Sequence, residues 1–152
     1  MKNKKRTIYF ILIILMTVLI WANSVLPANI SGAQSGFVVN TVQSTLTIFG
    51  IYMNTDILSI IIRKSAHFVE FFILGLLWYQ FLKELETNNK LVKWYAIIFC
   101  LVTALIDESI QLFSDGRAFQ LTDIAIDLFG SSMAIFSLVF ASYLQTKKGE
   151  SV

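Results

Sequence analysis

Charged side chains, cysteine and proline are all scarce in this sequence of 152 residues. Only 14% of the residues are charged and 56% are hydrophobic, whereas soluble domains usually carry about 25% charged and about 45–50% apolar residues. This composition excludes a disordered chain, a nucleic-acid-binding arm and an ordinary soluble enzyme. The single cysteine, Cys100, excludes an internal disulfide and any two-cysteine metal or redox motif. One proline and seven glycines leave little material for linkers, so we expect a single domain over residues 1–152.

In place of these residues the sequence has long apolar segments. Each is close to the roughly 20 residues that a helix needs to cross the hydrocarbon of a bilayer. The alternating pattern of barrel strands is absent, and only helices or closed barrels satisfy their backbone hydrogen bonds in lipid. The sequence therefore predicts an all-α integral membrane protein with four transmembrane helices. These helices are expected at about 7–25, 57–82, 94–113 and 121–144.

The positions of lysine and arginine predict how the helices are oriented. Nine of the twelve basic residues fall in three places: the N-terminal segment, the loop after the second helix and the C-terminus. Four spans bring these places to one side of the membrane, and an excess of basic residues marks the cytoplasmic side. We therefore expect both termini in the cytoplasm. A cleaved signal peptide is the alternative for the first segment, although its apolar stretch is long for one. The nine residues are Lys2, Lys4, Lys5, Arg6, Lys83, Lys90, Lys93, Lys147 and Lys148.

The segment between the first two predicted spans is almost uncharged and carries an amphipathic pattern within residues 34–50. It lacks the basic face of helices that bind membrane surfaces. Three placements stay open: on the outer leaflet, as a re-entrant segment, or packed over the bundle. Asn54 or Thr55 is expected to cap the helix that follows. The apolar residues at helical spacing are Phe37, Val38, Val42, Leu46 and Phe49.

Ionisable side chains occur within three of the four predicted spans. A charge at the centre of a membrane helix costs about 2.5–3.5 kcal/mol on insertion scales, so such groups indicate function by default. Their spacings of three and four residues give each helix one polar face. All three faces fall in the outer half, below Arg117 in a connecting turn, which predicts one polar cavity open to the extracytoplasmic side. The ionisable residues are Arg63, Lys64, His67 and Glu70, then Asp107 and Glu108, then Asp123 and Asp127, and the neutral Gln111 lies on the same face as Asp107 and Glu108.

Three roles for these side chains follow from their chemistry. As a binding site, Arg63, Lys64 and Arg117 would hold phosphate or carboxylate groups, and Asp107, Gln111 and Asp127 would hold amines or hydroxyls. As an enzyme, a neutral His67 with Glu70 would act as an acid–base pair on a lipid-linked substrate, with Glu108 or Asp123 as a second base. As a purely structural device, ion pairs would hold the helices in register, although desolvation makes that an expensive means of stabilisation.

We expect no cofactor and no metal. His67 and Glu70 with carboxylates from two other helices are similar to the carboxylate-rich metal sites of helical bundles, but three nearby cations compete for the acids. The expected partners are the lipid bilayer and a polar envelope ligand, namely a phospholipid headgroup or a lipid-linked cell-wall precursor; nucleic acid is not expected. The small residues from Gly130 to Ala134 allow close packing, either within the bundle or in a homo-oligomer. A proton-coupled transporter is a further alternative, and with four spans it would need such a homo-oligomer.

Two charged motifs resemble those of VanZ-like membrane proteins. Residues 63–75, Arg-Lys-Ser-Ala-His-Phe-Val-Glu-Phe-Phe-Ile-Leu-Gly, are similar to the K-x-x-H-F-x-E-[FY] segment of that family. The polar stretch 23–36 resembles the Ser-rich loop of many members. The resemblance implies a protein of the bacterial cytoplasmic membrane that acts at the cell surface, with resistance to the glycopeptide teicoplanin as the associated function. The second motif is carried by Asp107-Glu108-x-x-Gln111-x-Phe113, Gly116-Arg117, Asp123 and Asp127-x-x-Gly130. This sequence departs from the family pattern at two positions: Asp115 stands where many members have Pro, and Asp127 where many have Asn.

Overall fold

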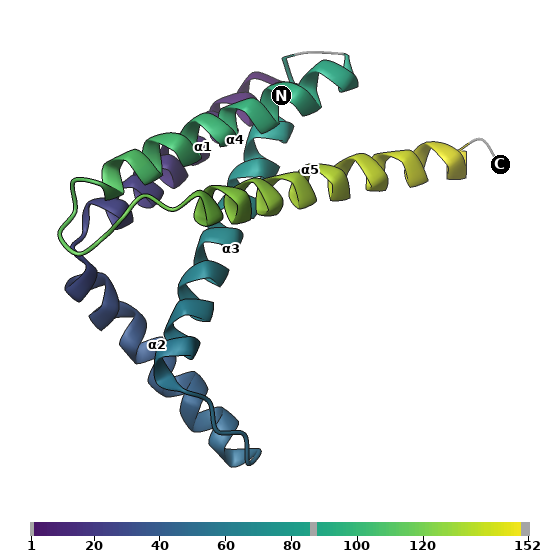
Figure 1. Cartoon of the computed structure of the whole chain (residues 1–152). Coiled ribbons are helices and arrows are strands. Elements are labelled where there is room, and N and C mark those ends of the chain that lie inside the picture. The colour runs from purple at the N-terminus through teal and green to yellow at the C-terminus, as the bar shows by residue number, and fades with distance from the viewer. Residues whose placement is uncertain (1, 86–87, 150–152) are drawn as a thin grey trace.

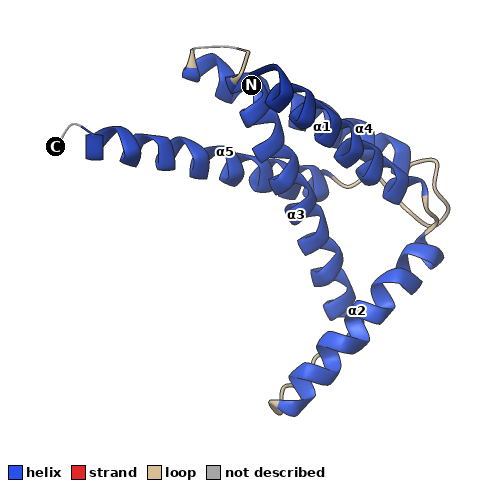
Figure 2. Cartoon of the chain, turned by 180° about the vertical axis from the view of Figure 1, so that it is seen from behind, coloured by secondary structure: helices blue, strands red, loops and turns tan. Residues whose placement is uncertain are grey.

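Helices are the only regular secondary structure in the described part of the chain. A computed structural model describes residues 2–85 and 88–149, and within them it contains five helices and no strand (Figures 1 and 2). The all-α class is therefore confirmed. Each predicted span corresponds to one of four helices, with a fifth helix between the first two. The helices are α1 (Lys2–Val25), α2 (Ala28–Ile48), α3 (Thr55–Lys83), α4 (Asn89–Gln111) and α5 (Leu121–Gly149).

The helices α1, α4 and α5 are longer than the apolar segments that predicted them. Each extends five residues beyond the predicted segment at its basic end, because lysine and arginine favour helix nearly as well as apolar residues do. Three residues used to predict the orientation, Lys2, Lys90 and Lys148, have side chains outside the described part of the structure. The single-domain prediction likewise includes residues 1, 86–87 and 150–152, which lie outside the described residues.

The helix between the first two spans begins earlier than the sequence predicted. The amphipathic pattern indicated 34–50, but α2 starts at Ala28, directly after Pro27, so the stretch interpreted as a Ser-rich loop is largely helical. Its hydroxyl groups donate to carbonyls one turn back, as Ser35 does to Ser31 at 2.9 Å, which satisfies them within the helix. Helix α2 packs on α3, where Val39 is buried.

The apolar residues of the predicted pattern differ in their exposure. Val42 and Leu46 are partly buried, whereas Phe37 and Phe49, the residue just after α2, are 78% and 75% exposed. The apolar pattern alone did not identify which side of this helix meets α3, because apolar residues occur on both sides.

The turn from α2 into α3 forms as local chemistry predicts. Gly50 adopts a positive φ of 73°, a left-handed conformation that glycine tolerates without strain. Asn54 then caps α3: its side-chain oxygen accepts from the backbone N–H groups of Asp56 at 2.7 Å and Ile57 at 3.4 Å. Such a cap is worth about 1 kcal/mol. Between the two predicted caps, Asn54 is thus the one that forms.

Helix α3 is the centre of the fold and packs against each of the other helices. Figure 1 shows α1 and α4 side by side and running in the same direction, with α5 running back and α3 crossing the group steeply. Glycines let α3 and α5 approach closely. A Cβ on Gly130 would lie 2.5 Å from the Phe68 carbonyl oxygen, and one on Gly75 would lie 2.8 Å from the Ser131 carbonyl oxygen. The small residues of α5 therefore pack within the chain.

Much of the outer surface of α1 and α5 is apolar. Leu15 and Val18 on α1 are 59% and 57% exposed, and Phe136 on α5 is 69% exposed. The stretches Asn3–Val25 and Leu121–Lys147 are long and apolar enough to cross a membrane, by length and composition. Continuous exposed apolar surface of this kind marks a membrane or a protein partner.

Candidate functional site

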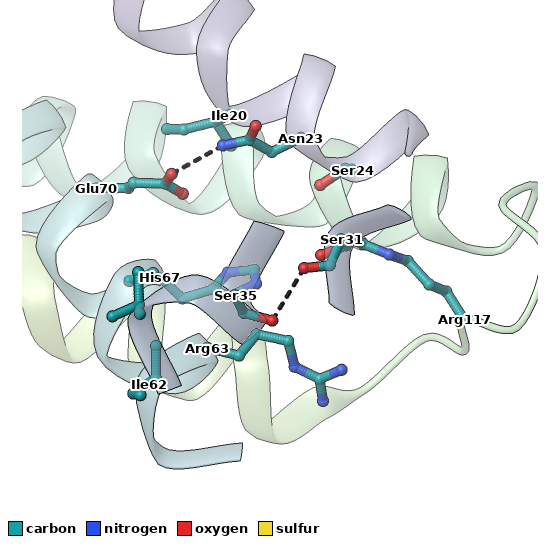
Figure 3. Close-up of a pocket in the computed structure, with 12 residues that line it drawn as sticks. Ile20, Asn23, Ser24, Ser31, Ser35, Ile62, Arg63, His67, Glu70 and Arg117 are labelled. Carbon is teal, nitrogen blue, oxygen red and sulfur yellow. Dashed lines mark hydrogen bonds between the residues drawn. The ribbon is translucent and has the colours of Figure 1, made fainter. Parts of the chain in front are cut away.

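Every residue predicted for the site lies at one end of the bundle, where α1 and α4 end and α5 begins. The group divides into two adjoining parts. The part called here the carboxylate network consists of buried acids on α4 and α5 and the side chains that contact them. The part called the arginine cavity is a hollow between α1, α2 and α3, closed on one side by the α4–α5 connection (Figure 3).

On α4 the carboxylate network is fully hydrogen-bonded. Asp107 and Glu108 are completely buried. Asp107 accepts from the Ser24 hydroxyl at 2.5 Å and from the Gln111 amide at 3.1 Å. Glu108 accepts from the same Gln111 amide at 2.8 Å and from the backbone N–H of Gln120 at 2.7 Å. The three- and four-residue spacings let one amide bridge both acids, and Glu108 fixes the chain just before α5 begins.

Two acids on α5 face nitrogen-bearing side chains of α3. Lys64 forms an ion pair with Asp123, which lies in the first turn of α5, where the helix dipole favours an anion. One turn later, Asp127 faces His67, with 3.3 Å between Nδ1 of the imidazole and Oδ1 of the carboxylate. This contact lacks the alignment of a hydrogen bond, and neither oxygen of Asp127 has a hydrogen-bond partner within the described residues.

The arginine cavity has a volume of about 210 Å³. The Asn23 amide donates to Oε1 of Glu70 at 3.1 Å across it. Figure 3 shows Arg117 reaching from the α4–α5 connection towards α2. Apolar side chains, among them Ile20 and Ile62, complete the wall. The polar lining comes from four parts of the chain: Asn23 and Ser24, Ser31 and Ser35, Arg63, His67 and Glu70, and Arg117.

The two arginines give this cavity its electrostatic character. Neither Arg63 nor Arg117 forms an ion pair with any residue in the described ranges. Burial, followed by the neighbouring Arg63 guanidinium, lowers the pKa of Arg117. Arginine nevertheless stays protonated in proteins, so two positive charges face the same small space. An anion would offset their mutual repulsion.

The structure brings all ten predicted site residues to one region but separates them by role. Arg63, His67, Glu70 and Arg117 line the arginine cavity, whereas Lys64, Asp107, Glu108, Gln111, Asp123 and Asp127 lie in or against the carboxylate network. The general pairing of cations with acids that the sequence suggested is limited, among the described residues, to Lys64 with Asp123 and His67 with Asp127.

Sequence reasoning missed the contribution of α1 and α2. Ser24 is 2% exposed and hydrogen-bonds Asp107, and Ser31 and Ser35 line the cavity. Two signals were available: polar residues directly follow the apolar run of α1, and Ser31 and Ser35 are four residues apart, which places them on one face of a helix.

Metal-ligating side chains also meet here, in a combination different from the one that the sequence raised. His67, Asp107 and Asp127 each offer an atom, and these atoms lie within 4.8 Å of one another. The combination considered from sequence used Glu70 and Glu108 in place of Asp107. Glu70 is instead turned to Asn23, and both oxygens of Glu108 are hydrogen-bonded elsewhere.

Comparison with known proteins gives one match. A family model described as VanZ/LLP1 matches residues 9–142, from the second turn of α1 to the last third of α5. Neither a curated protein nor a solved structure matches the chain.

Proposed function

The chain belongs to the VanZ/LLP1 family, and we propose that it is a four-span protein of the bacterial cytoplasmic membrane that binds an anionic lipid headgroup from the outer side. The observation that carries this proposal is the arginine cavity, where Arg63 and Arg117 face a small hollow without an ion-pair partner among the described residues. The headgroup is that of a phospholipid or a lipid-linked cell-wall precursor.

The arrangement of the helices supports this topology. The start of α1, the end of α3 and the start of α4 lie at one end of the bundle (Figure 1). The lining of the arginine cavity includes Asn23 and Ser24 near the end of α1 and Arg117 beyond the end of α4. The end of the bundle where α1 starts carries the basic segments, which favour the cytoplasm. Both termini are then cytoplasmic and the cavity faces outward.

Fusions to reporter proteins test this topology. A C-terminal green fluorescent protein fusion is expected to fluoresce and a C-terminal alkaline phosphatase fusion to be inactive, with the reverse for fusions at Gly50. The opposite pattern contradicts the topology.

The size of the cavity decides between ligand classes. Pockets for drug-sized molecules are about 300–1,000 Å³, so about 210 Å³ suits a phosphate-bearing headgroup and not a glycopeptide. Guanidinium groups bind phosphate through paired hydrogen bonds, while Glu70 suits an amine or hydroxyl on the same headgroup. Apolar side chains in the wall suit the first carbons of a lipid tail. In this proposal, any teicoplanin resistance arises through the bound envelope lipid.

The proposal is tested by lipid binding to the purified full chain. In native mass spectrometry with phosphatidylglycerol, we expect the Arg63→Ala/Arg117→Ala double variant to bind at least tenfold less lipid than wild type, since charge-assisted bonds are worth roughly 1.5–3 kcal/mol each. Arg6→Ala, an exposed arginine outside the cavity, is the control and should bind as wild type does. Equal lipid retention by the double variant overturns the proposal.

Teicoplanin susceptibility of a host expressing the same variants at equal levels tests the resistance role.

A second candidate, an integral membrane enzyme, is favoured by the position of His67. This side chain lines the arginine cavity and lies 3.3 Å from the buried Asp127, and a carboxylate that orients an imidazole is typical of a general base. Glu108 and Asp123, suggested earlier as second bases, are engaged in the carboxylate network, so Glu70 is the acid better placed to assist. His67→Gln is expected to abolish turnover of a lipid-linked phosphate ester while headgroup binding persists; turnover at the wild-type rate excludes this role.

A further inference from the structure

Three metal-ligating side chains converge beside the arginine cavity from three different helices. His67 belongs to α3, Asp107 to α4 and Asp127 to α5, and one atom of each lies within 4.8 Å of the other two. Ligands held about 2.0–2.2 Å from a zinc ion lie roughly 3–4 Å from one another. The three side chains are therefore close to a coordinating arrangement.

A second, independent observation concerns the hydrogen bonding of Asp127 and His67. Asp127 is fully buried, yet neither of its oxygens has a hydrogen-bond partner among the described residues, and Nδ1 of His67 has none either. Buried charges in proteins are paired or coordinate metals, and an unsatisfied buried polar group costs about 1–3 kcal/mol, more when charged. Every neighbouring acid is satisfied: Glu108 by two donors and Asp123 by Lys64. Asp127 is the exception, and it faces His67.

Three cations, Arg63, Lys64 and Arg117, were expected to compete with a metal for the acids. None of them forms an ion pair with Asp107 or Asp127 among the described residues. Lys64 pairs with Asp123, and Arg63 and Arg117 line the cavity without an ion pair to any described acid. Asp107 and Asp127 thus lie beside the same imidazole, and no lysine or arginine among the described residues forms an ion pair with either of them. A cation bound between the two carboxylates would offset their mutual repulsion.

We propose that His67, Asp107 and Asp127 bind a divalent transition-metal ion, with Zn²⁺ as the best match to one imidazole and two carboxylates. Ser24 and Gln111 donate to Asp107 at 2.5 and 3.1 Å, as the groups that orient metal-bound carboxylates do. Three protein ligands leave a coordination position open, which is the pattern of catalytic rather than structural zinc. His67 also lines the arginine cavity, so the proposed metal site adjoins that cavity.

Metal content of the full chain in detergent tests the site. After removal of metal by a chelator, reloading with Zn²⁺ and dialysis, elemental analysis should find one zinc per chain. Asp127→Asn and His67→Asn should raise the dissociation constant at least about 100-fold, because even partners that only orient the ligands contribute 10–100-fold. Asp123→Asn is the matched control: the same change, one turn away on the same helix, at an acid that pairs with Lys64. It should retain zinc.

A second measurement does not depend on the variants folding. Wild-type protein loaded with Co²⁺ should show the visible absorption bands of a low-symmetry cobalt site, and added Zn²⁺ should remove them and raise the melting temperature. Absence of bands and of any zinc above background overturns the proposal, as does equal zinc in Asp127→Asn and wild type or an equal loss in Asp123→Asn. Since no lipid is present, this result is independent of headgroup binding.

Discussion

The carboxylate network and the arginine cavity contain the same kinds of residue, lie side by side and differ in how their polar atoms are satisfied. In the network, Glu108 and Asp107 each accept hydrogen bonds on both oxygens, and Asp123 has Lys64. In the cavity, Arg63 and Arg117 line the hollow without an ion-pair partner among the described residues. A satisfied buried network stabilises one arrangement of helices, whereas unpaired charges around a hollow provide binding energy for a ligand. One region is therefore satisfied within the fold, whereas the other is the place of the proposed headgroup binding.

The residues on the boundary between the two regions sharpen this contrast. His67 lines the cavity and contacts Asp127, which is buried like the network acids but unsatisfied like the cavity arginines. A buried polar group without a hydrogen-bond partner calls for an explanation, such as strain, a catalytic role or a bound ion. This is the physical reason for proposing the metal there and not among the acids of α4.

The largest expected effect comes from breaking the ion pair between α3 and α5. Lys64→Ala leaves Asp123, which is 2% exposed, as a buried charge without its partner, and such a loss costs about 3–5 kcal/mol. The neighbouring change Arg63→Ala removes a cavity charge with no partner and should cost less than about 1 kcal/mol. Thermal unfolding of both variants in detergent measures the difference. Equal melting temperatures would show that the distinction between the two regions is wrong.

A smaller effect is expected where the glycines hold α3 against α5. Gly130→Ala places a methyl group 2.5 Å from the Phe68 carbonyl oxygen, and separating the helices to relieve the contact should cost about 1–3 kcal/mol. It should also weaken the Lys64–Asp123 pair, since that pair bridges the same two helices. Gly36→Ala on α2, where no atom lies within 4 Å of the added carbon, is the control and should be neutral or slightly stabilising. The melting temperature decides, and a Gly130→Ala protein as stable as wild type contradicts the packing described.

The smallest expected effect concerns ligand preference in the arginine cavity. Glu70 accepts from the Asn23 amide at 3.1 Å and supplies the negative charge nearest the two arginines in the lining. Glu70→Gln keeps the hydrogen bond and removes the charge, so stability should change by less than about 1 kcal/mol. Preference for phosphatidylglycerol over phosphatidylethanolamine should rise several-fold, because an amine loses its partner. Competition between the two lipids in native mass spectrometry measures it, and an unchanged ratio removes Glu70 from the proposed binding site.

The amino-acid sequence by itself determined the local features of this protein. The four apolar segments, the cap at Asn54 and the polar faces of three helices follow from composition and from spacings of three and four residues, which act within one or two turns. The two charged motifs likewise indicated the family, which the match over residues 9–142 confirms. The early start of α2 escaped prediction because its serines satisfy their hydroxyls within the helix, which no apolar pattern reveals.

Only the tertiary structure decided which polar face meets which. Spacing gives the side of a helix on which a residue lies, but the neighbour on that side depends on helix crossings, and here Gly75 and Gly130 let α3 and α5 come together. That contact assigns Lys64 to Asp123 and leaves Asp127 facing His67. It also leaves the arginines of α3 and of the α4–α5 connection around a cavity, without an ion-pair partner among the residues that the structure describes. Partners of this kind are separated by tens of residues, and long-range packing, not local propensity, selects them.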